Sequence, residues 1–157
     1  MPSQALIKYG TIVKPTITLA SLANGAGRVS ALVDNATVRA PMATIYLKVT
    51  TGGTAPTANT PIKCYLIRRS NDSTTDLIEN PVTGIVDAAA TPEPVNAELL
   101  GSIVVTAATN ATYTKAFLAY DLSQEYQIVV WNATGQALNA TAGNHELQVL
   151  PTTMEAQ

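Results

Sequence analysis

Polar and apolar residues alternate along most of this chain, and the alternation restricts its fold more than any other feature. In residues 44–51 (TIYLKVTT), Ile45, Leu47 and Val49 share one face of an extended chain, and the residues between them share the other. Alternation over about four to eight residues is typical of a half-buried β-strand. The same pattern recurs in residues 16–22, 28–34, 62–69, 100–107, 111–120, 126–132 and 146–150.

Short clusters of turn-forming residues separate these segments. They lie at residues 24–27 (NGAG), 52–56 (GGTAP), 132–135 (NATG) and 142–144 (AGN). Gly and Asn tolerate positive φ and Pro fixes φ, so such clusters favour tight turns between strands. About eight short strands with regular turn signals predict an all-β fold, a two-sheet antiparallel sandwich with jelly-roll-like topology.

The 157 residues fit a single domain. The pattern predicts an extended N-terminal arm at residues 1–15, because Pro15 disfavours a central strand there. The sandwich domain then covers residues 16–151 and includes a long connection at residues 71–96. Residues 152–157 are polar and predict a flexible tail.

The predicted arm is unusually apolar for a chain terminus. Its large side chains are Leu6, Ile7, Tyr9, Ile12 and Val13, which would not remain stable in water. An extended segment can add to the edge of a neighbouring sheet through main-chain hydrogen bonds, which demand little of its side chains. These five residues are therefore the candidate interface.

Composition and charge exclude several partners. Only 13% of the residues are charged, the net charge is −2, and the nine Lys and Arg residues are scattered. A nucleic-acid-binding protein would gather its basic residues on one face. No apolar run reaches the roughly 18 residues of a membrane-spanning helix, and the N-terminus lacks the apolar stretch of a signal peptide. We expect neither nucleic acid nor a membrane as partner, and synthesis in a cytoplasm without secretion.

The residues that usually carry catalysis are scarce. Cys64 and His145 are the only cysteine and the only histidine, too few for a zinc site or a disulfide. Cys64 shares a strand face with Ile62 and Leu66, which predicts a buried, inert thiol. His145 stands at the start of a strand with no companion, which favours simple solvation. The chain has no Gly-x-Ser-x-Gly motif to support a serine nucleophile.

Four carboxylates of the long connection, Asp72, Asp76, Glu79 and Asp87, could form an acid pair or a calcium site. Their spacing lacks the regular calcium-loop pattern, so a solvated polar loop is the better interpretation. Trp131 could be either a core residue or an interface anchor. The sequence therefore predicts no enzyme, no catalytic residue, no metal site and no cofactor.

Several segments resemble a known group of virion proteins. These are residues 100–107 (LGSIVVTA), 112–117 (TYTKAF), 126–141 (YQIVVWNATGQALNAT) and 28–35 (RVSALVDN). In the third, a strand ends in an Asn-x-Thr-Gly-x-x-Leu turn before a last strand, here residues 145–150. Together these segments resemble small β-sandwich structural proteins of tailed bacteriophages, of the capsid decoration or cement type.

The resemblance implies a protein that binds the outer surface of a phage head, where major capsid subunits meet, and stabilises the shell. It further implies a homotrimer with the major capsid protein as partner. Two alternatives remain open. A neck, tail or baseplate protein of a phage would share the fold and the context. A β-sandwich adhesion or carbohydrate-binding module would call for a secretion signal or exposed aromatic rings.

Overall fold

The computed structural model describes residues 5–70, 86–90 and 92–156, in which every regular element except one short turn is a β-strand. The strands are β1 (Ala5–Tyr9), β2 (Ala26–Val29), β3 (Val33–Asp34), β4 (Met42–Thr50), β5 (Pro61–Arg69), β6 (Ala88–Ala90), β7 (Glu98–Val104), β8 (Thr112–Tyr120), β9 (Glu125–Asn132) and β10 (Glu146–Ala156); the 3₁₀ turn η1 is Ala142–Asn144. No helix of the described residues has the length and apolarity to cross a membrane.

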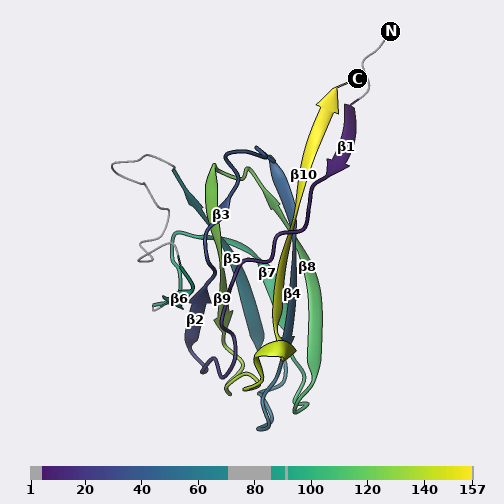
Figure 1. The fold of residues 1–157 in the computed structure, drawn as a ribbon. Helices are drawn as coiled ribbons and strands as arrows, with labels where there is room; N and C mark the ends of the chain where they lie inside the picture. The colour runs from purple at the N-terminus through teal and green to yellow at the C-terminus, as the bar shows by residue number, and fades with distance from the viewer. Residues whose placement is uncertain (1–4, 71–85, 91, 157) are drawn as a thin grey trace.

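The strands form two antiparallel sheets that pack face to face (Figure 1). The four-stranded sheet has the order β1-β10-β4-β8. The six-stranded sheet has the order β6-β2-β9-β5-β7, with β3 paired to β9 beside β2. The predicted two-sheet sandwich is confirmed, with ten strands where the sequence predicts about eight; β1 and β6 are the strands that alternation does not reveal.

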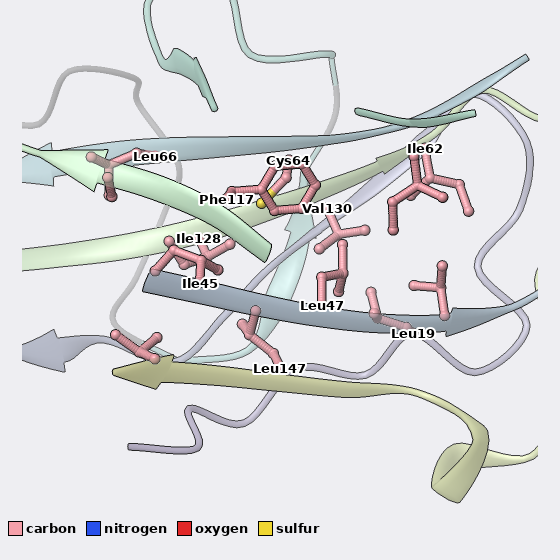
Figure 2. Packing of buried hydrophobic residues seen from close by; sticks show 14 of the residues in the cluster. Leu19, Ile45, Leu47, Ile62, Cys64, Leu66, Phe117, Ile128, Val130 and Leu147 are labelled. Atoms are coloured by element: carbon pink, nitrogen blue, oxygen red, sulfur yellow. The ribbon is translucent and has the colours of Figure 1, made fainter. Parts of the chain in front are cut away.

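The main core lies between the two sheets. On β4, Ile45, Leu47 and Val49 are fully buried, as their alternation predicts. Leu47 on β4 and Val130 on β9 point toward one another across the space between the sheets (Figure 2). Cys64 also lies in this core, which confirms the predicted buried thiol.

A second, smaller core covers the outer face of the six-stranded sheet. It consists of Val29, Tyr65, Ile67, Ala90, Val129 and Trp131. β6 extends the edge of this sheet by pairing with β2, and Asp87 just before it accepts hydrogen bonds from Arg28 and Thr18. Trp131 is only 7% exposed, so it is a core residue and not an interface anchor. Much of the outer face of the six-stranded sheet is thus buried, whereas Leu99, opposite Tyr65, is 53% exposed.

Residues 16–22, predicted as a strand, cross from one sheet to the other as irregular chain. Val13 still pairs with β10 of the four-stranded sheet, whereas Ala26 begins β2 in the six-stranded sheet. Leu19 and Leu22 remain buried in the main core during this crossing. Leu19 and Leu22 are three residues apart, so their burial does not follow the period of two and does not depend on a strand ladder.

The predicted strand at residues 28–34 is divided into β2 and β3 by a buried serine. The Ser30 hydroxyl accepts a hydrogen bond from the Ile128 N–H at 3.0 Å and donates one to the Ala31 carbonyl. A side chain that bonds to the neighbouring backbone competes with the regular ladder. The strand therefore stops at Val29 and resumes at Val33.

The prediction of a flexible tail after Pro151 is wrong for the described residues 152–156. They continue β10, and each of them pairs with a residue of β1. Polar Thr152 and Thr153 fit a strand because β-branched side chains suit the pleated backbone. The polar residues that predict a loose end therefore belong to a strand, in which Thr152 is buried and Glu155 is exposed.

Candidate interaction surface

Most of the outer face of the four-stranded sheet is open to solvent, and among the described residues η1 lies only over the end of β4. Along β4, the buried Ile45 and Leu47 point into the core, and Thr44, Tyr46 and Lys48 point out to solvent. An antiparallel sheet with one solvated face normally carries polar residues there. Here the solvated face also carries large apolar side chains.

We call these side chains the outer-face belt. Their exposure ranges from 37% for Tyr46 to 66% for Tyr9. The members are Ile7, Tyr9, Tyr46, Leu118, Tyr120 and Met154. Large contiguous apolar patches on a protein surface mark sites that bind other molecules.

Strand register brings the belt together from four strands that are distant in sequence. Tyr9 lies opposite Thr152, which lies opposite Met42, which lies opposite Tyr120. Directly paired residues of an antiparallel sheet point to the same face, so this row crosses the whole sheet. Ile7 and Met154 form the next pair along the same face.

Part of the belt lies on a two-stranded extension of the sandwich. β4 pairs with β10 only as far as Met42 opposite Thr152. Beyond that point β10 pairs with β1 alone, and the two strands project from the body of the sandwich (Figure 1). We call β1 together with residues 153–156 of β10 the terminal ribbon. Leu6, Ile7 and Met154 on this ribbon are between 44% and 63% exposed.

All five arm residues predicted as an interface are exposed, but they do not form one surface. Ile7 and Tyr9 belong to the outer-face belt. Leu6 points to the opposite face of the terminal ribbon, as does its neighbour Lys8, which forms an ion pair with Glu155 at 2.6 Å. Ile12 and Val13 lie beside the middle of β10, where Val13 exchanges two 2.8 Å backbone hydrogen bonds with Val149.

The arm is extended, as predicted, yet it pairs with the end of its own chain. Its pairing partner is the segment for which the sequence predicts a loose tail. Four belt residues, Tyr46, Leu118, Tyr120 and Met154, were not identified from the sequence. A usable signal exists for two of them, because residues 117–120 are apolar on both faces of one strand.

A group of charges borders the belt near the start of β10. Glu146 lies 2.7 Å from Lys14 and 3.7 Å from Lys48. Hydrogen bonds from Lys14 and Gln148, together with the two positive charges, lower the pKa of Glu146 to about 2. Each charge here has a partner in the same chain. The apolar side chains of the belt, in contrast, are exposed to solvent and have no covering partner among the described residues.

Each candidate catalytic group either forms an ion pair, is buried in the core, or lies outside the described residues. Asp72, Asp76 and Glu79 lie outside them. Asp87 is 2.8 Å from an Arg28 nitrogen and serves to hold its segment on the six-stranded sheet. Complete burial raises the pKa of Cys64 to about 12, so its thiol stays protonated and non-nucleophilic. Within the described residues no three His, Cys, Asp or Glu side chains come together as metal ligands.

The position of His145 before a strand predicts a simply solvated side chain, and this prediction is wrong. The turn η1 brings its half-buried ring over the end of β4. The Thr50 N–H lies 3.4 Å from Nδ1, and Nε2 lies 2.8 Å from the Asn139 carbonyl. A neutral ring that accepts at Nδ1 and donates at Nε2 satisfies both contacts. His145 is therefore a structural connection between β4 and the loop before β10.

This geometry predicts a stability that depends on the charge of His145. Burial, and to a smaller extent the charge of Lys48, lower the pKa of His145, although the bond to Asn139 opposes them. The unfolded chain then binds a proton more readily, so the free energy of unfolding should be constant above about pH 6.5 and fall below it. Urea denaturation between about pH 5 and 7.5 measures this fall.

A His145→Gln variant is the control, because its side chain does not titrate. Its stability should not vary over the same interval. Glu146 does not contribute in this interval, since its lowered pKa makes it lose stability only as the pH falls from about 4.5 to about 2. An unchanged slope in His145→Gln would assign the pH dependence to another group.

Comparison with known proteins finds no relative: no family model, no curated protein and no solved structure matches this chain.

Proposed function

We propose that this protein is a structural contact protein that decorates the head of a tailed bacteriophage. It binds the outer surface of the shell, at junctions of the major capsid protein, and stabilises it. The observation that carries the contact role is the outer-face belt, an exposed apolar surface on a sandwich whose other sheet has a second hydrophobic core on its outer face. The assignment to a phage head depends on the resemblance of residues 28–35, 100–107, 112–117 and 126–141 to decoration proteins.

The chemistry of the belt suits a protein-binding role. Tyr9, Tyr46 and Tyr120 supply rigid aromatic area with a polar hydroxyl, and tyrosine is enriched in protein interfaces. The charges at its border are already paired, so little charge has to be desolvated when a partner covers the face. The terminal ribbon reaches beyond the body of the sandwich and can contact more than one shell subunit.

Deletion of residues 1–13 should abolish binding to heads and leave the sandwich folded. The deletion removes Ile7 and Tyr9 from the belt and takes the partner strand from the end of β10. Folding should survive because, among the described residues, the buried hydrophobic core begins at Leu19. Co-sedimentation with decoration-free heads of the phage that encodes the chain measures binding, and thermal melting measures folding. Unchanged binding would remove the arm from the mechanism.

A matched pair of point variants separates the two faces of the terminal ribbon. Tyr9→Ser removes a belt side chain, whereas Leu6→Ser removes a side chain from the opposite face. Interface aromatic residues contribute about 2 kcal/mol or more, so Tyr9→Ser should weaken head binding by at least about tenfold. Leu6→Ser should bind nearly as well as the unmodified chain. Equal losses in both variants would contradict binding through the belt.

The position of the gene offers an independent test. A gene beside that of a major capsid protein supports head decoration. A gene among tail genes would instead favour a neck, tail or baseplate protein, and a gene outside any phage region would refute the proposal.

A further inference from the structure

In the described residues the two sheets end in β6, β7, β8 and β1, the two-residue β3 forms a further short edge beside β9, and all of these except β1 are protected. β6 is only three residues long. β7 is interrupted by a register shift opposite Cys64 and Tyr65 and carries Gly101 at φ 148°. β8 lies against β7, where Lys115 donates a hydrogen bond to the Ser102 carbonyl at 2.8 Å. Short strands, irregularities and covering are the means by which proteins prevent edges from pairing with other chains.

β1 is the exception among these strands; on the other side of the terminal ribbon, residues 153–156 of β10 also pair with one strand only. The five residues of β1 contain neither proline nor glycine, and its register with β10 is regular throughout. Its one charged residue, Lys8, is neutralised by Glu155 of the same ribbon. Ile7 and Tyr9 are 63% and 66% exposed. An edge strand of this kind is a template for pairing.

The free backbone groups of β1 belong to alternate residues. The Gly10 N–H donates to the Pro151 carbonyl at 2.8 Å. In an antiparallel pair the bonded residues alternate, so Lys8 and Leu6 also direct their backbone groups toward β10. The N–H and C=O groups of Ile7 and Tyr9 therefore point away from β10, toward the open edge.

We propose that β1 pairs with β1 of a second copy of this chain, antiparallel, about a two-fold axis at Ile7. Ile7 then lies opposite Ile7 of the second copy, Leu6 opposite Lys8, and Ala5 opposite Tyr9. Every residue of β1 takes part, and the four-stranded sheets of the two copies become one continuous sheet. Such an interface is self-complementary, as two-fold symmetry requires.

Charge disfavours one of the two neighbouring registers. A shift of the second copy by two residues would place Lys8 opposite Lys8, and like charges directly opposite one another destabilise a sheet. In the proposed register Lys8 faces Leu6, and each Lys8 keeps its own Glu155. On the outer face, Met154 and Ile7 of one copy continue into Ile7 and Met154 of the other as an uninterrupted apolar row.

Pairing also supplies what the terminal ribbon lacks. An isolated two-stranded ribbon is marginally stable in water, whereas three or more strands with an apolar face are stable. Beyond Thr152 the ribbon of one copy has only two strands, and with a second copy it has four. This inference goes beyond head binding and does not depend on it. It predicts a dimer, in place of the homotrimer that the resemblance implies.

Cysteine crosslinking tests the register. Residues in a bonded antiparallel pair have Cα atoms about 5.5 Å apart, within the range that a disulfide spans. Ile7→Cys should therefore give a disulfide-linked dimer on mild oxidation. Tyr9→Cys is the matched control, because the two copies of position 9 lie four residues apart along the strands, roughly 14 Å. The native Cys64 is buried and does not interfere.

Sedimentation of the full chain tests the assembly. The unmodified protein should have the mass of two chains, and Ile7→Pro should have the mass of one. Proline removes an N–H that points to the open edge and leaves the bonds from β1 to β10 intact, so the variant should still melt cooperatively. Ile7→Thr keeps the N–H and should remain a dimer.

The contrary outcomes are equally definite. A monomeric or trimeric unmodified chain would overturn the pairing, as would a dimeric Ile7→Pro or equal crosslinking of both cysteine variants. The chain could instead be a monomer whose β1 backbone N–H groups become protected from hydrogen exchange when it binds the shell. That result would mean that β1 pairs with the capsid protein and not with a second copy. A monomer that still binds heads would refute only the pairing, and a dimer that binds no heads would refute only the proposed function.

Discussion

Truncation of Leu47 to alanine should lower the free energy of unfolding by about 2–5 kcal/mol, the range observed when a buried leucine leaves a cavity. Leu47 lies at the middle of β4, fully buried, and points toward Val130 of the opposite sheet (Figure 2). Backbone hydrogen bonds on both sides of β4, to β10 and β8, prevent the strand from collapsing into the space. Urea denaturation at neutral pH measures the loss.

Leu118→Ala is the matched control, because it makes the same change on the outer face of the same sheet. Leu118 is 57% exposed, so its truncation creates no cavity. The free energy of unfolding should fall by at most about 1 kcal/mol, because alanine has a lower strand propensity than leucine. Similar losses in the two variants would mean that the outer face is already covered in solution, which would itself indicate an interface.

Replacement of Asn132 by alanine should lower the free energy of unfolding by about 3 kcal/mol, because it leaves several buried polar groups without partners. Asn132 is fully buried at the end of β9. Its Nδ2 donates to the carbonyls of Leu22 and Gln136, both at 2.8 Å. Its Oδ1 accepts from the backbone N–H and the hydroxyl of Thr134, at 3.1 and 2.7 Å. All four hydrogen-bonding positions of the amide are therefore in use.

Asn24→Ala provides the comparison, since it removes the same amide group from the same corner of the fold. Asn24 is exposed and accepts a bond from the Gly135 N–H at 2.8 Å. Water can replace that bond, so the loss should stay below about 1 kcal/mol. An equally small loss for Asn132→Ala would show that water enters the corner when the amide is removed.

The corner around Asn132 also explains why the Asn-x-Thr-Gly-x-x-Leu segment has its composition. Thr134 and Leu138 are buried, and Gly135 has φ 84° with the Thr57 hydroxyl 2.7 Å from the place of a Cβ. Each defining residue of the segment thus serves the turn from β9 toward β10. The resemblance therefore rests on residues that shape a sandwich, and the contact role rests on the outer-face belt.

Alternation was sufficient to predict the strands that cover the core on both sides. It identified β4, β5, β8 and β9 within a few residues, and it placed Ile45 and Cys64 on buried faces. Alternation failed for residues that are buried but do not belong to a hydrogen-bonded strand. Leu19 and Leu22 are buried in the main core although their segment belongs to neither sheet. His145 is held by a loop that no local pattern reveals.

The sequence by itself determined that this is a β-sandwich with an apolar, extended N-terminus, because the period of two is a local property of each segment. Only the tertiary structure decided what that N-terminus does. β1 pairs with the far end of the chain, from Ala5 with Ala156 to Tyr9 with Thr152, and no local signal encodes a partner so distant. That pairing builds the terminal ribbon, completes the outer-face belt and leaves an open edge. Which faces stay uncovered depends on how all the strands are ordered, and this order arises only when the two sheets pack together.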